Sequence, residues 1–197
     1  MQTAGVIIAG GKGVRLGGDK PLHAFGPATL IETVLDRVRF QVDALAINVP
    51  LETVSRYRAH IGDDLTLLND DEPGDIGPLA GILSGLQWAE QQGAAWLATF
   101  PADTPFLPHD LVSRLLASSP GPVPTAAHDG TRLHGLCAIW PVGARAALLD
   151  GVRNRDVRSL FQAITHLGGG ECPFADGPDA FFNVNTPEDL ARAVQML

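Results

Sequence analysis

The stretch Ala4-Gly-Val-Ile-Ile-Ala-Gly-Gly-Lys-Gly-Val-Arg-Leu-Gly-Gly-Asp-Lys20 says most about how this chain folds. Its residues 6–9 form a continuous apolar run, which predicts a β-strand that is buried on both faces. Five glycines follow within residues 10–18. Because glycine tolerates positive φ and lets a backbone approach a ligand closely, we expect a strand that opens into a flexible, turning loop.

Three cationic side chains lie among these glycines, namely Lys12, Arg15 and Lys20. A loop that is rich in N–H groups and cations, and that follows a buried strand, is suited to binding a polyphosphate. A surface loop with solvated charges is the alternative interpretation.

The loop departs from two standard phosphate-binding patterns. A Walker loop needs a Lys directly after its second glycine and then a hydroxyl, whereas here Asp19 precedes Lys20 and Pro21 follows it. A dinucleotide fingerprint needs a third glycine where Leu16 stands. The loop therefore indicates phosphate binding of neither standard type.

The composition is that of a single globular domain. The chain has 197 residues, of which 45% are hydrophobic, and its formal net charge is −8. The negative charge argues against general binding to nucleic acid or to a membrane surface. Cys137 and Cys172 lack the spacing of a disulfide scaffold or a zinc site. Because there is no apolar run of membrane-spanning length and no signal-peptide pattern, we expect a cytoplasmic protein.

The hydrophobic pattern alternates between strands and helices. We expect strands over residues 6–9, 44–49, 65–68 and 96–100, and helices over residues 29–39, 52–60, 79–92, from 108, 142–149 and 155–166. This alternation predicts an α/β fold with a mostly parallel sheet and helices on both faces. Residues 122–127 and 133–140 flank an Asp-Gly turn and predict a hairpin. A short strand ending in residues 181–185 and a last helix capped by Thr186 complete the prediction.

Polar side chains follow the predicted strands. In an open parallel sheet, ligands bind beyond the carboxyl ends of the strands. The side chains expected at that edge are Asn48, Asp70, Asp71, Asp103, Asn183 and Asn185.

The residues Pro101-Ala-Asp-Thr-Pro105 place a carboxylate on a stiff turn. Asp103 is suited to binding Mg²⁺ together with phosphate oxygens and water, or alternatively to capping the turn. Strand alternation would put Asn183 and Asn185 on one side, where they could complete a metal site, orient a phosphate, or start the last helix.

Three further positions allow both structural and functional interpretations. Gly77, at the start of the helix before Gly81, could lie near a nucleotide base or ribose, or could simply serve helix packing. Asp70 could accept hydrogen bonds from a purine or could be solvated. His134 lies in a predicted strand, where packing is the commoner role of a histidine.

These motifs together resemble the molybdenum cofactor guanylyltransferases, within the larger nucleotidyltransferase group. The resemblance rests on Ile8–Lys20, Gly77–Gly81, Ala102–Pro105 and Asn183–Glu188, which occur in the family's order from the first strand to the last helix. It implies a three-layer, Rossmann-like nucleotidyltransferase fold. It also implies a nucleotide-binding half over about residues 1–105 and a second-substrate half over about residues 106–197.

The resemblance further implies the activity: transfer of GMP from GTP to the terminal phosphate of molybdopterin, with Mg²⁺ as cofactor and pyrophosphate as the second product. It implies a nucleotide site made of Ile8, Ala9, Gly10, Gly11, Lys20, Asn48, Asp70, Gly77 and Asp103. Arg15, Lys20 and Asp103 would act in catalysis, with Asp103 as the metal ligand. Asn183, Asn185 and His134 would lie on the side of molybdopterin, although His134-Gly135 stands where the family more often has His-Pro.

Other functions remain open at this point. A molybdopterin cytidylyltransferase or a sugar-phosphate nucleotidyltransferase would share the loop. An NAD(P)-linked oxidoreductase and a nucleotide-binding regulatory module are more distant alternatives. We also expect transient contacts with cofactor-biosynthesis proteins or with acceptor molybdoenzymes.

Overall fold

A computed structural model describes residues 1–10, 20–70 and 76–197. Within these ranges the chain forms a seven-stranded sheet in the order β5-β4-β1-β6-β8-β7-β9. The strands are β1 (Thr3–Ile8), β4 (Ala44–Asn48), β5 (Thr66–Leu68), β6 (Trp96–Pro101), β7 (Thr125–His128), β8 (Leu133–Pro141) and β9 (Gly170–Pro173). Strands β5, β4, β1 and β6 are parallel, and only β8 runs against its neighbours in the described sheet. The predicted mostly parallel α/β sheet is confirmed.

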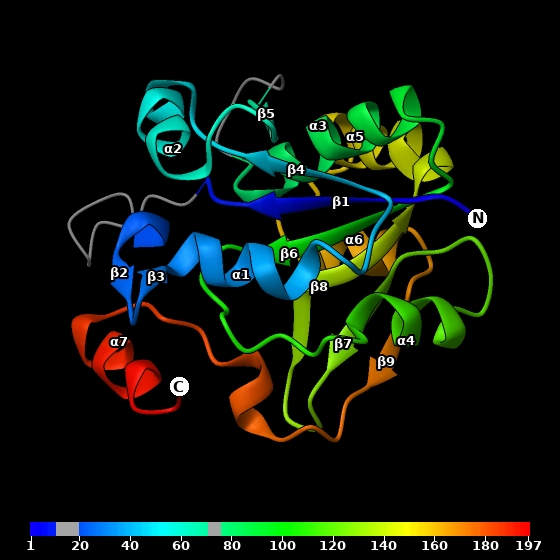
Figure 1. Cartoon of the computed structure of the whole chain (residues 1–197). Coiled ribbons are helices and arrows are strands. Elements are labelled where there is room, and N and C mark those ends of the chain that lie inside the picture. The colour runs from blue at the N-terminus through cyan, green and yellow to red at the C-terminus, as the bar shows by residue number, and fades with distance from the viewer. Residues whose placement is uncertain (11–19, 71–75) are drawn as a thin grey trace.

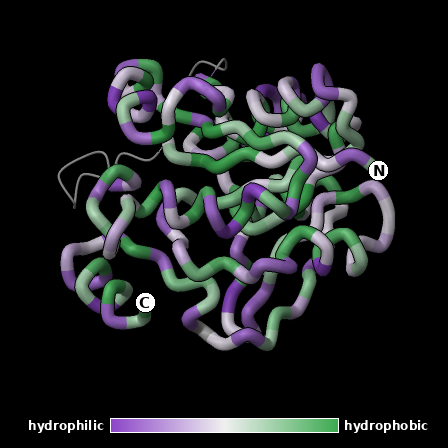
Figure 2. Tube along the Cα trace, viewed as in Figure 1, coloured by the Kyte–Doolittle hydropathy of each residue, from purple (hydrophilic) through white to green (hydrophobic). Residues whose placement is uncertain are grey.

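Helices cover both faces of this sheet (Figure 1). They are α1 (Leu30–Val38), α2 (Val54–Ile61), α3 (Pro78–Gln91), α4 (Leu111–Ser118), α5 (Arg145–Asn154), α6 (Leu160–His166) and α7 (Pro187–Val194). One core lies between the sheet and α3, α5 and α6, and a second lies between the sheet and α1, α2 and α4. Figure 2 shows the apolar strands inside and the polar residues mainly on the outer turns of the helices. The predicted three-layer arrangement is confirmed.

Strand β1 is buried over all six of its residues. Val6 and Ile8 contribute to one core and Ile7 to the other, so the strand has no polar face. The register aligns Ile8 with Asn48 on one side and with Pro101 on the other. Three parallel strands therefore end at the same level, and the residues that follow them emerge at one edge of the sheet.

A small satellite core lies beside that edge. The two-stranded hairpin of β2 (Ala24–Phe25) and β3 (Ala28–Thr29) packs against α7 through Phe25, Leu30, Val184 and Ala193. Helix α7 begins where predicted, because the Thr186 hydroxyl accepts a hydrogen bond from the Asp189 N–H. The last helix is thus held next to η2 (Lys20–Leu22) and the start of α1.

The predicted strand ending in residues 181–185 is wrong. Residues 178–181 form the 3₁₀ helix η5 (Pro178–Phe181), and residues 182–185 have no regular structure. The Val184 N–H donates to the Asp103 carbonyl, at 2.9 Å, so this segment is held by the turn after β6 and not by a sheet ladder. The edge strand next to β7 is instead β9, which was not predicted.

Three helix starts also differ from the prediction. The helix expected from residue 108 begins at Leu111, after Asp110. Residues 142–144 form the 3₁₀ helix η4 (Val142–Ala144), so α5 begins at Arg145. Helix α6 begins after Ser159, whose hydroxyl accepts from the Gln162 N–H in a capping box. Another 3₁₀ helix, η3 (Leu51–Thr53), precedes α2.

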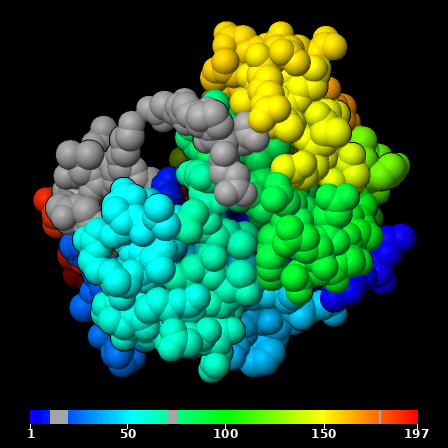
Figure 3. Space-filling view, turned by 90° about the horizontal axis from the view of Figure 1, so that it is seen from above, coloured from blue at the N-terminus to red at the C-terminus, as the bar shows by residue number. Residues whose placement is uncertain are grey.

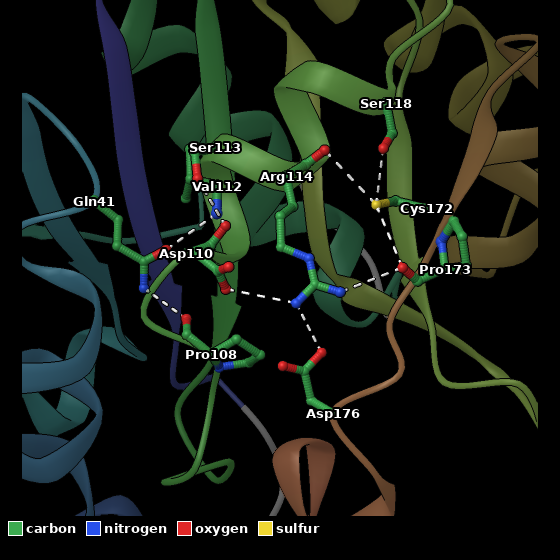
Figure 4. A network of polar contacts seen from close by, with 10 residues as sticks. All are labelled: Gln41, Pro108, Asp110, Val112, Ser113, Arg114, Ser118, Cys172, Pro173 and Asp176. Atoms are coloured by element: carbon green, nitrogen blue, oxygen red, sulfur yellow. Dashed lines mark hydrogen bonds and ion pairs between the residues drawn. The ribbon is translucent and has the colours of Figure 1, made fainter.

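A polar network fastens α4 to its neighbours (Figure 4). The Gln41 side chain, after α1, accepts from the Val112 N–H at 3.0 Å. On the other side, Arg114 donates to the Asp176 carboxylate at 2.8 Å and to the Pro173 carbonyl at 3.4 Å. The Gln41 contact ties α4 to the first half of the chain, and the Arg114 contacts tie it to the segment after β9. No helix in the described ranges is long and apolar enough to cross a bilayer.

A buried hydrogen bond between β6 and β8 gives a test of the fold. The Trp140 indole N–H donates to the Thr99 hydroxyl at 3.1 Å, and both residues are fully buried. Thr99→Val should lower the free energy of unfolding by about 1–3 kcal/mol, because the indole N–H loses its partner. Urea denaturation measures this. Thr99→Ser keeps the hydroxyl and is the control, and the account fails if the valine variant is the more stable of the two.

Candidate functional site

Three segments that are distant in sequence meet around Lys20. Its ammonium group donates to the Asp103 carboxylate at 2.5 Å and to the Asn185 side-chain oxygen at 2.9 Å. Lys20 begins η2, Asp103 follows β6, and Asn185 precedes α7. The Lys20 and Asp103 side chains are only 15% and 20% exposed. The sequence predicted that these residues gather at the carboxyl edge of the sheet, and the structure brings them into contact.

A second hydrogen bond positions Asn183 beside this group. The buried Thr104 hydroxyl donates to the Asn183 side-chain oxygen at 2.6 Å. The sequence analysis did not single out Thr104. The only available signal was its place between Asp103 and Pro105, on a turn that was already expected to be stiff. Thr104 thus links the Asn183 side chain to the turn that carries Asp103.

The oxygen donors here suit a hard divalent cation. Asp103 offers a carboxylate and Asn185 a carboxamide oxygen, and Mg²⁺ prefers such ligands, with phosphate oxygens and water completing its shell. Within the described ranges, no three His, Cys, Asp or Glu side chains gather to form a metal cage. The chemistry of these two oxygen groups fits an ion that also binds phosphate oxygens and water.

The ends of β4 and β5 are joined by a side-chain hydrogen bond. The Asn48 amide donates to the Asp70 carboxylate at 2.9 Å. Asn48 is 1% exposed, whereas Asp70 is exposed. Of the two predicted nucleotide contacts, Asp70 is thus the one that is open to a ligand, and Asn48 holds it in place.

Two glycines explain how α3 approaches Asn48. Gly77 has φ of +57° at the helix N-cap, a conformation that disfavours other residues. A Cβ on Gly81 would lie 2.5 Å from the Asn48 side-chain oxygen and 2.9 Å from Ile8. The motif Gly77–Gly81 therefore allows the first turn of α3 to lie directly against the ends of β1 and β4.

The remaining predicted nucleotide contacts lie at the end of β1. Ile8 is mostly buried, and the Ala9 N–H donates to the Asn48 carbonyl at 2.9 Å. Gly10 follows, with space for a Cβ 3.5 Å from the Asn48 oxygen. The predicted phosphate contacts Gly11 and Arg15, and also Lys12 and Asp71, lie outside the described residues.

His134 has a partner that the sequence analysis did not identify. Its Nε2 lies 2.8 Å from the Asp129 carboxylate, and its ring stacks on Phe181 with 4.4 Å between centroids. Hydrogen bonds from Thr131 and Arg132 hold the pKa of Asp129 well below its usual value. Burial lowers the pKa of His134 below its ordinary value, against the opposing effect of Asp129. At neutral pH this is a neutral imidazole beside a carboxylate.

A pocket of about 230 Å³ connects the two groups of residues. It is lined by Pro101, Asp103, Arg132, Leu133, His134, Gly135, Leu136, Cys137, Leu160 and Asn183. Asp103 and Asn183 thus face both the Lys20 cluster and the His134 side. The structure therefore brings together the predicted metal ligand Asp103 and two of the predicted second-substrate residues, His134 and Asn183, around one cavity, whereas Asn185 does not line it.

The upper face of the molecule is formed by helices from both halves of the chain. Figure 3 shows α2, α3 and α5 covering the upper face of the molecule. Helix α3 packs against β1 and α5, so the strand ends and the first turn of α3 belong to one rigid unit.

Comparison with known proteins shows the family to which this chain belongs. Residues 5–167 match the family model of the MobA-like NTP transferase domain. A molybdenum cofactor guanylyltransferase from Cereibacter sphaeroides is 39% identical over 198 residues, which cover 100% of this chain and 98% of that protein. The molybdopterin-guanine dinucleotide biosynthesis protein A of Archaeoglobus fulgidus has a similar structure, with a TM-score of 0.76 and 22% identity over 99% of this chain and 98% of that one.

Another solved structure with a similar fold is that of a Mycobacterium tuberculosis protein in complex with manganese. Its TM-score is 0.69, with 18% identity over the full length of both chains. The fold and the site define a nucleotidyltransferase. Within that class, the chain belongs to the molybdenum cofactor guanylyltransferases of the MobA-like NTP transferase family.

The two tightly packed glycines of α3 allow a matched test of the Asn48 position. Gly81→Ala should weaken nucleotide binding about tenfold or more, because the new methyl displaces Asn48 and with it Asp70. Gly85→Ala is the control, since its Cβ would meet Val6 at 2.9 Å in the core and not Asn48. Calorimetric titration with GTP, with the folded fraction checked by thermal unfolding, separates the two effects. Equal loss of GTP affinity in both variants would contradict this role.

Proposed function

We propose that this chain transfers GMP from GTP to the terminal phosphate of molybdopterin, releasing pyrophosphate. The observation that carries the proposal is the meeting of Lys20, Asp103 and Asn185 at the sheet edge, next to a pocket on the side of the second substrate. The relatives of this chain that are named molybdenum cofactor guanylyltransferase share 36–41% of its residues over nearly the whole chain.

The nucleotide is proposed to lie across the ends of β1, β4 and β5. Its phosphates would contact Gly10, Gly11, Arg15 and Lys20. Ile8 and Ala9 would line the site, and Asn48, Asp70 and Gly77 would lie at the base or ribose. The burial of Asn48 supports an indirect part for it, in which it holds the exposed Asp70 toward the base.

Mg²⁺ is the proposed cofactor, with Asp103 as its protein ligand and the carboxamide of Asn185 close by. When bound, the ion would neutralise charge on the α-phosphate and on the departing pyrophosphate. The hard oxygen donors support this choice, as does the manganese complex of the similar mycobacterial structure.

The reaction needs little from a general base. A phosphate monoester is mostly dianionic at neutral pH, with a second pKa of about 6. Its oxygen forms a bond to the α-phosphorus while the bond from that phosphorus to the bridging oxygen of the β-phosphate breaks. The electron pair leaves with pyrophosphate. Lys20 and Arg15 would stabilise the negative charge that develops, so positioning and electrostatics carry the catalysis.

The second half of the chain is proposed to bind molybdopterin. Asn183, Asn185 and His134 would lie on this side, so that residues 1–105 hold the nucleotide and residues 106–197 hold the acceptor. We further propose that the protein acts in the cytoplasm and makes transient contacts with cofactor-biosynthesis proteins or acceptor molybdoenzymes.

Nucleotide selectivity tests the function directly. GTP with Mg²⁺ should raise the melting temperature, whereas CTP, UTP and ATP should have much smaller effects, because only a bound ligand stabilises the native state. Pyrophosphate release should require both GTP and molybdopterin. A preference for CTP would favour a cytidylyltransferase, and release with a sugar phosphate would favour that substrate class. Binding of a nicotinamide cofactor would favour an oxidoreductase, and GTP binding without turnover would favour a regulatory module.

Variants of the central ion pair test the assigned residues. Lys20→Ala and Asp103→Ala should each lower turnover about a hundredfold or more, because each removes a group that stabilises transition-state charge. Asp150→Ala is the control, since it removes an ion pair of 2.9 Å, to Arg155, outside the candidate site. Steady-state rates with folded protein decide the matter. Wild-type turnover in either Lys20→Ala or Asp103→Ala would exclude that residue from catalysis.

A further inference from the structure

One wall of the pocket beside Asp103 is formed by a stretch of strand β8 whose pairing is irregular. Ala126 pairs with Ala138, but the next residue of β7, Ala127, pairs with His134. Residues 135–137 of β8 are therefore three extra residues between two successive pairs, which is a larger irregularity than the usual one-residue bulge. The pairing of β8 with β6 also stops at Ala138. The strand leaves its neighbour next to Pro101, and the pocket opens there.

The bulge places His134 where two contacts hold its ring. Asp129 accepts from Nε2 at 2.8 Å, and Phe181 stacks on the ring at an interplanar angle of 20°. Both His134 and Asp129 have side chains that are only 8% exposed. A carboxylate that accepts from Nε2–H selects this tautomer, which leaves Nδ1 as a hydrogen-bond acceptor.

These two partners are themselves held firmly. The other oxygen of Asp129 accepts from Thr131 and from the Arg132 N–H, at 2.6–2.9 Å. Phe181 makes an edge-on contact with Phe174, and Phe174 carries the Arg114 guanidinium 3.7 Å from its ring centroid. The ring of His134 is thus fixed on one side by Asp129 and on the other by Phe181, whose contacts lead through Phe174 to Arg114 of the α4 network in Figure 4.

The opposite wall depends on a close approach of α6. A Cβ on Gly135 would lie 2.7 Å from the Leu160 Cβ, so only glycine allows Leu160 to come this near. Leu160, the first residue of α6, lines the pocket together with Leu133 and Leu136. The cavity therefore has a mixed lining. Its three leucines form the apolar part, the His134 imidazole and the Asn183 carboxamide are its neutral hydrogen-bonding groups, and Asp103 and Arg132 carry charge.

We infer that this bulge pocket binds the uncharged heterocyclic ring of the acceptor, and that Asp129 is a positioning residue that presents His134 as an acceptor for an N–H group of that ring. The inference rests on the proposed function, because molybdopterin supplies such a ring behind its phosphate. A ring held here would direct the phosphate past Asp103 and Asn183, toward the Lys20 cluster. The neighbouring carboxylates Asp129 and Asp103 make the pocket less suitable for the phosphate itself.

The test uses the full chain with Asp129→Asn, His134→Gln and the double variant. Asp129→Asn is chosen because an amide can keep the turn contacts to Thr131 and Arg132 while losing the charge that selects the His134 tautomer. Asp150→Asn is the control, since Asp150 also accepts from two side chains, those of Asn154 and Arg155, at the end of α5. The measurements are the KM for molybdopterin under anaerobic conditions, kcat, and the Kd for GTP.

We expect each single variant to raise the KM for molybdopterin about fivefold or more, the effect of losing one hydrogen bond, with much smaller changes in kcat and in the Kd for GTP. The double variant should resemble His134→Gln alone, because Asp129 acts through His134. The Asp150→Asn control should match the wild type.

Three results would overturn the inference while leaving the proposed function intact. The first is an unchanged KM for molybdopterin in Asp129→Asn, and the second is a double variant in which the effects of the two single variants multiply. The third is a loss of kcat and of GTP affinity in Asp129→Asn as large as the rise in KM, which would show a structural role for Asp129. Failure of the proposed function is separate and visible first, since the wild type would then release no pyrophosphate with molybdopterin, and the inference would fall with it.

Discussion

The backbone hydrogen bond from the Val184 N–H to the Asp103 carbonyl joins the two ends of this site. It holds the segment before α7 against the turn after β6, although the two lie about eighty residues apart in sequence. The contact of Asn185 with Lys20 and the bond between Thr104 and Asn183 both depend on this placement. The satellite core around Val184 stabilises it further, because a buried valine fixes the segment between its two asparagines. The last helix is thereby part of the site and not an appendage to the sheet.

A protein of net charge −8 that binds two phosphate compounds must arrange its cations locally. In the described residues, the Lys20 ammonium group is held between Asp103, after β6, and Asn185, before α7. Its positive charge therefore lies within the candidate site. The attraction between an anion and a partly buried cation a few ångströms away is only weakly screened by salt. Overall charge repels anions at long range, and the local arrangement gives them one place to bind.

Much of the fold could be predicted because its signals are local. The run at residues 6–9 has no polar face, and Thr29 and Thr186 each stand before a helix with an acidic residue three positions later, which forms a capping box in both cases. Asp103 and Lys20 were predicted at one edge because parallel strands end together. Residues 181–185 were assigned to a strand because their alternation fits one, but a single tertiary hydrogen bond from Val184 decides their conformation.

The partnership of Asp129 with His134 was hidden for a related reason. Both residues were visible in the sequence, one in a turn and one in a strand, yet their contact depends on a bulge that no local propensity specifies. The same bulge ends the pairing of β8 with β6 at Ala138 and so opens the pocket beside Asp103. In a regular ladder, residues 135–137 would continue to pair and fill this space. A departure from ideal sheet geometry thus opens a cavity beside Asp103, at the place where we propose that the second substrate binds.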